Sequence, residues 1–195
     1  MGRSDIPYAQ RMAMKHQNDI VYNRDYAAKI AMYCASVAMN EVKGIGYIRL
    51  VRFSQEFDKT VNEFYADPEV SMAHAIRRME QIGMPITDEI YCPIIPGESK
   101  KQQEIRAHAM QAVKIALICC HITMNDVFGF GATTQATISD RITELTDRYK
   151  REGEGWLLEK MEKLGFHIED GNAKIYLDEN DKPITKKQWK ELQND

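Results

Sequence analysis

Residues 29–46 read KIAMYCASVAMNEVKGIG and residues 114–131 read KIALICCHITMNDVFGFG, so one pattern occurs twice in the chain. Both copies begin with Lys-Ile-Ala, carry a cysteine, and end with Met-Asn, an acidic residue, Val and two glycines one residue apart. A gapless alignment of residues 15–54 with residues 100–139 has 14 identical positions in 40. Self-similarity of this kind predicts that one folding unit is present twice.

The similarity resumes further along, where RRMEQIGMPI (77–86) matches EKMEKLGFHI (159–168). We therefore predict a mainly α fold made by tandem duplication of a three-helix unit. Two copies of a unit that buried a face against its twin are expected to pack about a pseudo-twofold axis. The predicted organisation is a first unit over residues 1–91, a joint over 92–99, and a second unit over 100–195.

The predicted helices follow from apolar residues at three- and four-residue spacing. These predict long helices over about residues 15–42 and 99–127, with a break in the first near Asn23 or Asp25 and Ser99 as N-cap of the second. A second amphipathic helix follows each glycine pair. A third opens at Asp67-Pro68 and ends at Gly83, and Gly165 ends its counterpart.

Each unit is predicted to end in extended structure. PITDEIYCPII (85–95) is typical of a strand, and HIEDGNAKIYLDENDKPIT (167–185) of a β-hairpin, because β-branched residues alternate around turn residues. Thr185 is expected to cap a last short helix, KKQWKEL.

The composition is that of a soluble globular protein. The 195 residues are 44% hydrophobic and 28% charged, with a net charge of −3, which excludes a disordered chain and a protein built mainly to coat nucleic acid. We find no continuous apolar run of membrane-span length and no signal peptide, so we expect a cytoplasmic protein. Four cysteines without C-x-x-C spacing are expected to be reduced and buried: Cys34, Cys92, Cys119 and Cys120.

The glycine pairs are better explained as turns between helices than as phosphate cradles. A nucleotide loop follows a strand and opens a helix, whereas each glycine pair here follows a long helix. The asparagine before each pair is expected to bind the turn's backbone.

A pseudo-twofold could also bring Glu41 and Asp126 together as a metal or acid–base pair. The chain has no H-E-x-x-H, D-x-D or G-x-S-x-G motif, and its five histidines do not repeat between the copies. We therefore expect no catalytic residue, metal or cofactor, and keep a metal-dependent enzyme as a distant alternative.

The two turns differ in chemistry. The first is basic, with Lys43 before it and Arg49 and Arg52 after it, whereas the second holds Phe128 and Phe130. Cations there could bind phosphates or an acidic protein surface, and exposed rings could fill a partner's pocket. These five residues are the candidate partner-binding site. The alternative is that the arginines form a solvated face and the phenylalanines pack into the core.

The second turn, MNDVFGFG (124–131), is similar to the N-D-E-F-G-F-G motif of small uncharacterised proteins from Firmicutes prophages and other mobile elements. The first turn, MNEVKGIG (39–46), resembles it less, but the basic residues that follow the motif occur only there, as Arg49 and Arg52. The resemblance covers about 40 residues per copy. It implies a phage or plasmid gene acting in a bacterial cytoplasm, a setting that includes anti-CRISPR inhibitors.

The expected function is accordingly that of a non-enzymatic binding protein. Its most concrete form is an anti-CRISPR protein that binds and blocks a type II CRISPR effector nuclease. The alternative is a regulator of a mobile element that binds DNA or RNA through the basic face of the first unit. Self-association into a homo-oligomer is also open, and no membrane partner is expected.

Overall fold

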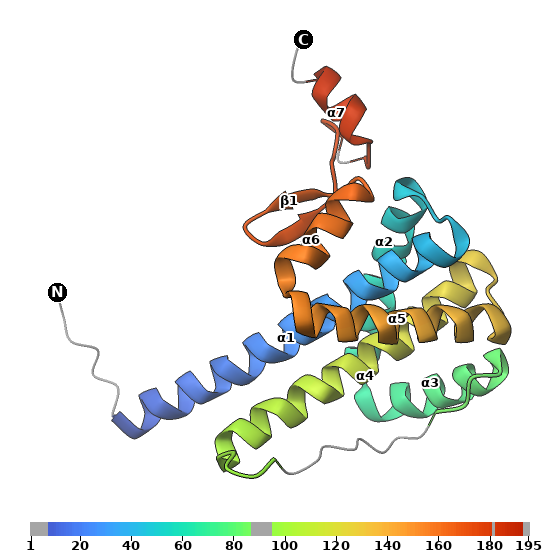
Figure 1. Ribbon diagram of the computed structural model, residues 1–195. Coiled ribbons are helices and arrows are strands. Elements are labelled where there is room, and N and C mark those ends of the chain that lie inside the picture. Colours follow the sequence, from blue (N-terminus) through green and yellow to red (C-terminus); the bar gives the residue numbers. More distant parts are fainter. Residues whose placement is uncertain (1–7, 87–94, 181, 193–195) are drawn as a thin grey trace.

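Two long helices, α1 (Tyr8–Lys43) and α4 (Lys100–Phe128), form the centre of the fold. The computed structural model describes residues 8–86, 95–180 and 182–192, and Figure 1 shows these helices side by side and running in the same direction. Seven side chains of these two helices have no exposed surface: Cys34, Ala35, Ala38, Met39, Cys119, Cys120 and Met124. Most of them are small, as close packing of a helix against its neighbours requires.

A glycine turn ends each long helix and leads into a shorter helix. α2 (Tyr47–Ala66) follows α1, and α5 (Ala132–Glu152) follows α4. Gly44 and Gly129 have φ angles of +63° and +67°, the left-handed region that favours glycine. The asparagine amides donate to the turn carbonyls, Asn40 to Ile45 at 3.0 Å and Asn125 to Phe130 at 3.1 Å. The predicted role of these asparagines is confirmed.

The shorter helices of each half of the chain pack against the long helix of the other half. α2 and α3 (Pro68–Ile82) pack against α4, whereas α5 and α6 (Glu154–Lys163) pack against α1. Phe53, Ile138, Leu157 and Met161 from these helices are buried in one core with the long helices. Each half therefore completes its core with helices of the other half.

A β-hairpin follows α6, as predicted. β1 (His167–Glu169) pairs antiparallel with β2 (Asn172–Lys174) around Asp170 and Gly171, which both have positive φ. The hairpin docks through backbone amides: that of Ala173 donates to the Tyr33 hydroxyl at 2.8 Å, and that of Tyr176 to the Tyr47 hydroxyl at 2.9 Å. The predicted last helix is α7 (Lys186–Leu192), with the Thr185 hydroxyl as its cap.

The mainly helical class is confirmed, and so is Ser99 as the N-cap of α4, where the structure adds a capping box with Gln102. The break predicted in the first helix is wrong, because α1 runs unbroken from Tyr8, well before residue 15. Asn23 lies within it and donates its amide to the Asp19 carbonyl one turn earlier. The strand predicted over residues 85–95 lies mostly outside the described residues, as does Cys92.

The three described cysteines are free and buried, as predicted. Burial raises the pKa of the Cys34 thiol to about 11 and that of Cys119 to about 12. Both thiols are therefore protonated at neutral pH and have little nucleophilic character.

Among the described helices, α4 is the one that is long and apolar enough to resemble a membrane span. Its most apolar stretch of 18 residues has a mean hydropathy of 1.3, enough by length and composition to cross a membrane. Half of that stretch is buried in the protein, and core helices of soluble proteins meet the same criterion.

The glycine pairs give a test with an internal control. Gly44→Ala is expected to lower the free energy of unfolding by about 1 kcal/mol, because an L side chain is strained at positive φ. Gly46→Ala is expected to have a much smaller effect, since Gly46 has a φ of −81° and an added Cβ would meet no heavy atom within 4 Å. Chemical denaturation measures both, and equal losses would contradict this explanation of the turn.

Candidate functional site

The candidate residues lie at the end of the molecule where both long helices turn. Lys43, Arg49 and Arg52 are exposed, whereas Phe128 and Phe130 are half-buried and pack against the core. The Arg49 guanidinium lies over the Phe128 ring, 5.0 Å from its centroid, and the two phenylalanine rings are 5.2 Å apart. The structure thus brings Arg49 of one turn onto Phe128 of the other.

We call Lys43, Arg49 and Arg52 the basic surface. In the part of the chain that the structure describes, none of the three has a carboxylate within ion-pair distance, and the acidic residues beside them are engaged elsewhere. Glu41 binds Arg141 and Lys160, and Glu56 binds Lys59 at 2.7 Å. The positive charge of the basic surface is therefore not neutralised locally and is available to a partner.

Phe128 and Phe130 are less available. Phe128 stacks on the buried Phe53 at 6.4 Å between centroids and is also covered by Arg49. A ring held between a core residue and a guanidinium presents only part of its surface. These rings mainly fix the turn and the arginine, which agrees with the packing alternative raised from the sequence.

Glu41 and Asp126, considered above as a metal pair, join the two halves of the chain. The Glu41 carboxylate accepts hydrogen bonds from Lys160 at 2.9 Å and from Arg141, whose nearest contact is 2.6 Å. Asp126 accepts from Arg78. Arg78 and Lys160 occupy matching positions in the aligned sequences, so the ion pair of Asp126 corresponds to that of Glu41.

The electrostatics of Glu41 agree with this role. Burial favours a raised pKa, but the hydrogen bonds from Lys160 and Arg141 outweigh it, and the pKa of Glu41 is lowered. Within the described residues, no three His, Cys, Asp or Glu side chains form a group that could hold a metal ion. Glu41 and Asp126 are thus occupied as ion-pair partners.

A buried polar pair supports the second turn and has no counterpart in the first. The Gln135 amide donates to the Phe130 carbonyl at 2.8 Å, so its oxygen faces His121 and accepts from Nδ1 at 2.6 Å. Ser36 and Leu50 stand at the matching positions of the first half. Burial lowers the pKa of His121, and the hydrogen bond to Gln135 only partly opposes this.

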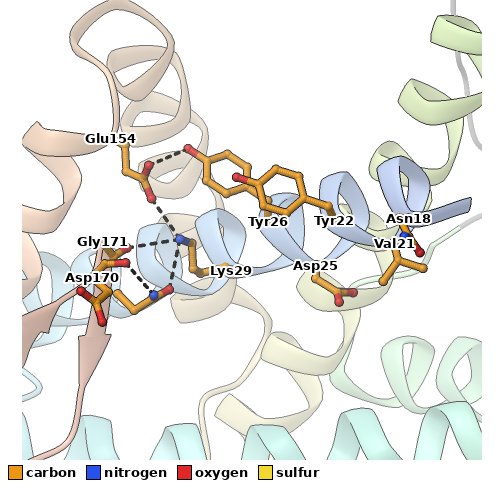
Figure 2. Close-up of a pocket in the computed structure, with 10 residues that line it drawn as sticks. Asn18, Val21, Tyr22, Asp25, Tyr26, Lys29, Glu154, Asp170 and Gly171 are labelled. Carbon is orange, nitrogen blue, oxygen red and sulfur yellow. Dashed lines mark hydrogen bonds and ion pairs between the residues drawn. The ribbon is translucent and has the colours of Figure 1, made fainter. Parts of the chain in front are cut away.

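A cleft lies away from the turns, between the outer face of α1, the start of α6 and the hairpin tip (Figure 2). Its volume is about 680 Å³. At its inner end the Lys29 ammonium donates to Glu154 at 3.0 Å and to the Gly171 carbonyl and the Asn172 side chain at 3.3 Å. Tyr26 donates to Glu154 at 3.1 Å.

These polar groups are satisfied by one another. Lys29 has used three hydrogen bonds, which is all an ammonium group can donate. Burial and the hydrogen bonds to Tyr149 and Glu154 raise the pKa of Tyr26, so its hydroxyl stays neutral. The network fastens α6 and the hairpin to α1, and leaves the outer residues of the cleft to face solvent.

This cleft was not among the sequence predictions. Of its residues, Lys29 could have been singled out from the sequence, because a lysine, Lys114, stands at the matching position of the second copy. Lys114, however, lines a different pocket of about 470 Å³, whose other lining residues are mostly apolar and include Met79, Met84 and Met110. Tyr26 is replaced by Gln111 in the alignment, so no repeated pattern pointed to the cleft.

Comparisons of the chain with protein-family models, with curated proteins and with solved structures found no match.

The ion pairs of Glu41 give a stability test. Glu41→Gln is expected to lower the free energy of unfolding by about 1–2 kcal/mol, because two cations lose their charged acceptor. The carboxylate stabilises the fold above its ordinary pKa, so the difference between wild type and variant should shrink as pH falls below 4.5. The control is Glu159→Gln, which breaks an exposed pair within α6. An equal loss of unfolding free energy in both variants would contradict the role of Glu41 in holding the two halves of the chain together.

His121 gives a second pH test. Its lowered pKa means that protonation favours the unfolded chain, so the free energy of unfolding should fall as pH drops below 6.5, by at most about 1.4 kcal/mol per pH unit. His121→Gln should flatten this dependence between pH 5 and 7, whereas His74→Gln at an exposed position of α3 should not. Urea denaturation at a series of pH values compares the slopes. If the free energy of unfolding depends on pH equally in the wild type and both variants, His121 is not the group responsible.

Proposed function

We propose that this chain is a non-enzymatic binding protein that covers a macromolecular partner with the basic surface of Lys43, Arg49 and Arg52. The observation that carries the proposal is the group of three exposed cations whose acidic neighbours are already paired. Arg49 is also held in place by its contact with Phe128, which reduces the entropy that its side chain loses on binding.

We further propose that the scaffold arose by tandem duplication and has pseudo-twofold symmetry. Four features support this: the same helix order in both halves, matching glycine turns, matching ion pairs at Glu41 and Asp126, and the crossed packing of the shorter helices. The difference between the halves then locates the binding face. Thr134 and Thr137 stand where the first half has Arg49 and Arg52.

The concrete form of the proposal is an anti-CRISPR protein of a phage or mobile element that blocks a type II CRISPR effector nuclease in the bacterial cytoplasm. It rests on the resemblance of MNDVFGFG (124–131) to the prophage motif and on the shape of the protein. A helical body with exposed cations at one end, one of them held by Phe128, suits an inhibitor that occludes an anionic face or a bound nucleic acid.

A nucleic-acid-binding regulator is the second candidate. The spacing of Arg49 and Arg52 supports it, because residues three apart on a helix lie on one face and could contact neighbouring phosphates. Such binding would not need a partner protein.

The two candidates are separated by paired assays on the variant Arg49→Ala/Arg52→Ala. Fluorescence anisotropy with duplex DNA and with single-stranded RNA over a salt series measures direct binding. DNA cleavage by a guide-loaded type II effector measures inhibition. The double variant should weaken inhibition by about tenfold or more, and any nucleic-acid binding should lose about two units of salt slope.

The matched control is Arg148→Ala/Lys150→Ala, which removes the same charge from α5, where both residues are paired with acids. Inhibition without nucleic-acid binding would support the inhibitor, and salt-dependent binding without inhibition would favour the regulator. Neither activity in the wild-type protein, or equal losses in both double variants, would overturn the role of the basic surface.

A further inference from the structure

An apolar cavity lies between α4, the end of α3 and α5, and the function proposed above does not use it. Its volume is about 470 Å³. Small-molecule sites in proteins have volumes of roughly 300–1,000 Å³ and mostly apolar walls. The apolar side chains that line this cavity are flexible or branched and include Met79, Met84, Met110, Val113, Leu117 and Ile118. Methionine side chains adapt to the shape of what they contact, so the cavity favours an apolar ligand.

His121 is the most deeply buried polar side chain among the described residues that line the cavity, with 6% of its surface exposed. Its hydrogen bonds fix which ring nitrogen carries the proton. The Phe130 carbonyl can only accept, so the Gln135 amide nitrogen faces it at 2.8 Å and the Gln135 side-chain oxygen faces His121. Since that oxygen can also only accept, the proton of the neutral ring lies on Nδ1, 2.6 Å away.

The other ring nitrogen, Nε2, is therefore a hydrogen-bond acceptor. Burial lowers the pKa of His121, so the ring is neutral at neutral pH and Nε2 keeps its lone pair. Within the described ranges Nε2 has no hydrogen-bond partner, and the one fully enclosed side-chain nitrogen or oxygen that lacks a partner there is Nδ1 of His16. Nε2 of His121 is thus not enclosed, and the accessible space beside this ring is the cavity that it lines.

We propose that the cavity binds a small apolar molecule that carries a hydroxyl group, and that this hydroxyl donates a hydrogen bond to Nε2 of His121. The apolar body of the ligand packs among the methionine and branched side chains. Ser139 also lines the cavity, and a hydroxyl can donate to the ligand's oxygen in return. The first half of the chain has no such acceptor, because serine and leucine replace His121 and Gln135 there.

Nitrogen NMR of the full chain labelled at histidine tests the acceptor before any ligand is added. In the wild-type protein, the His121 ring should carry its proton on Nδ1 and show an unprotonated Nε2. On addition of para-propylphenol, the Nε2 signal should shift in the direction of a hydrogen-bonded acceptor. A ring that carries its proton on Nε2, or an Nε2 signal that the phenol leaves unchanged, would overturn the proposal.

Three matched compounds test the ligand class by titration, followed through the methionine methyl signals of the protein. Para-propylphenol can donate a hydrogen bond, para-propylanisole is its methyl ether and cannot, and para-propylbenzoate is an anion. The phenol should shift the signals of Met79, Met84 and Met110 and should bind about tenfold more tightly than the ether. Equal affinities of phenol and ether, no binding of the phenol, or shifts confined to other methionines would contradict the site. Tighter binding of the benzoate would assign the selectivity to Lys114, which also lines the cavity.

The variant His121→Phe/Gln135→Leu removes the acceptor and its partner together, while Asn125 still donates to the Phe130 carbonyl. The phenol should then bind about tenfold more weakly, and the affinity of the ether should not change.

Val113→Phe fills the cavity and should abolish binding of both compounds. Its control is Val61→Phe, the same substitution at another half-buried valine, which lines a different cavity of about 290 Å³. The control should bind both compounds as the wild type does. Equal effects of the two valine substitutions, or a double variant that still prefers the phenol, would disprove the proposed site.

Discussion

The contact between α1 and α4 is the interaction on which the rest of the structure depends. The two long helices lie side by side, and the small side chains of Cys34, Ala38, Cys119 and Cys120 on them are completely buried. The shorter helices then cover this pair crosswise, α2 and α3 on α4 and α5 and α6 on α1. Each half of the chain therefore buries its apolar surface fully only when it contacts the other half.

The same arrangement explains where the two halves can differ. Positions between α1 and α4 have little room to change, because protein cores are closely packed. The helix ends carry no such constraint. There the first half has Lys43 and Arg49, whereas the second half has Phe128 and a buried His121–Gln135 pair beneath its turn. Matching backbones thus present a basic face on one side and a packed, aromatic turn on the other.

Much of the local structure was predictable, because its signals lie within a few residues. The glycine turns, the asparagine hydrogen bonds, the Ser99 capping box and the hairpin around Asp170 all follow from short-range stereochemistry. Contacts over long sequence distances were not. Nothing near Glu41 indicates that Lys160 binds it, and the cleft unites residues of α1 with a hairpin tip more than 140 positions later. The break predicted near Asn23 or Asp25 failed for a related reason: a helix that packs along much of its length tolerates residues of low helical propensity.

The crossed packing is tested most directly by dividing the chain at its joint. Circular dichroism and thermal unfolding would be recorded for fragment 1–91, for fragment 100–195 and for their mixture. Since each half completes its core with helices of the other, we predict that each fragment alone has little helix and no cooperative transition. The mixture should regain the helical signal and unfold cooperatively. A fragment that folds cooperatively by itself would contradict the account.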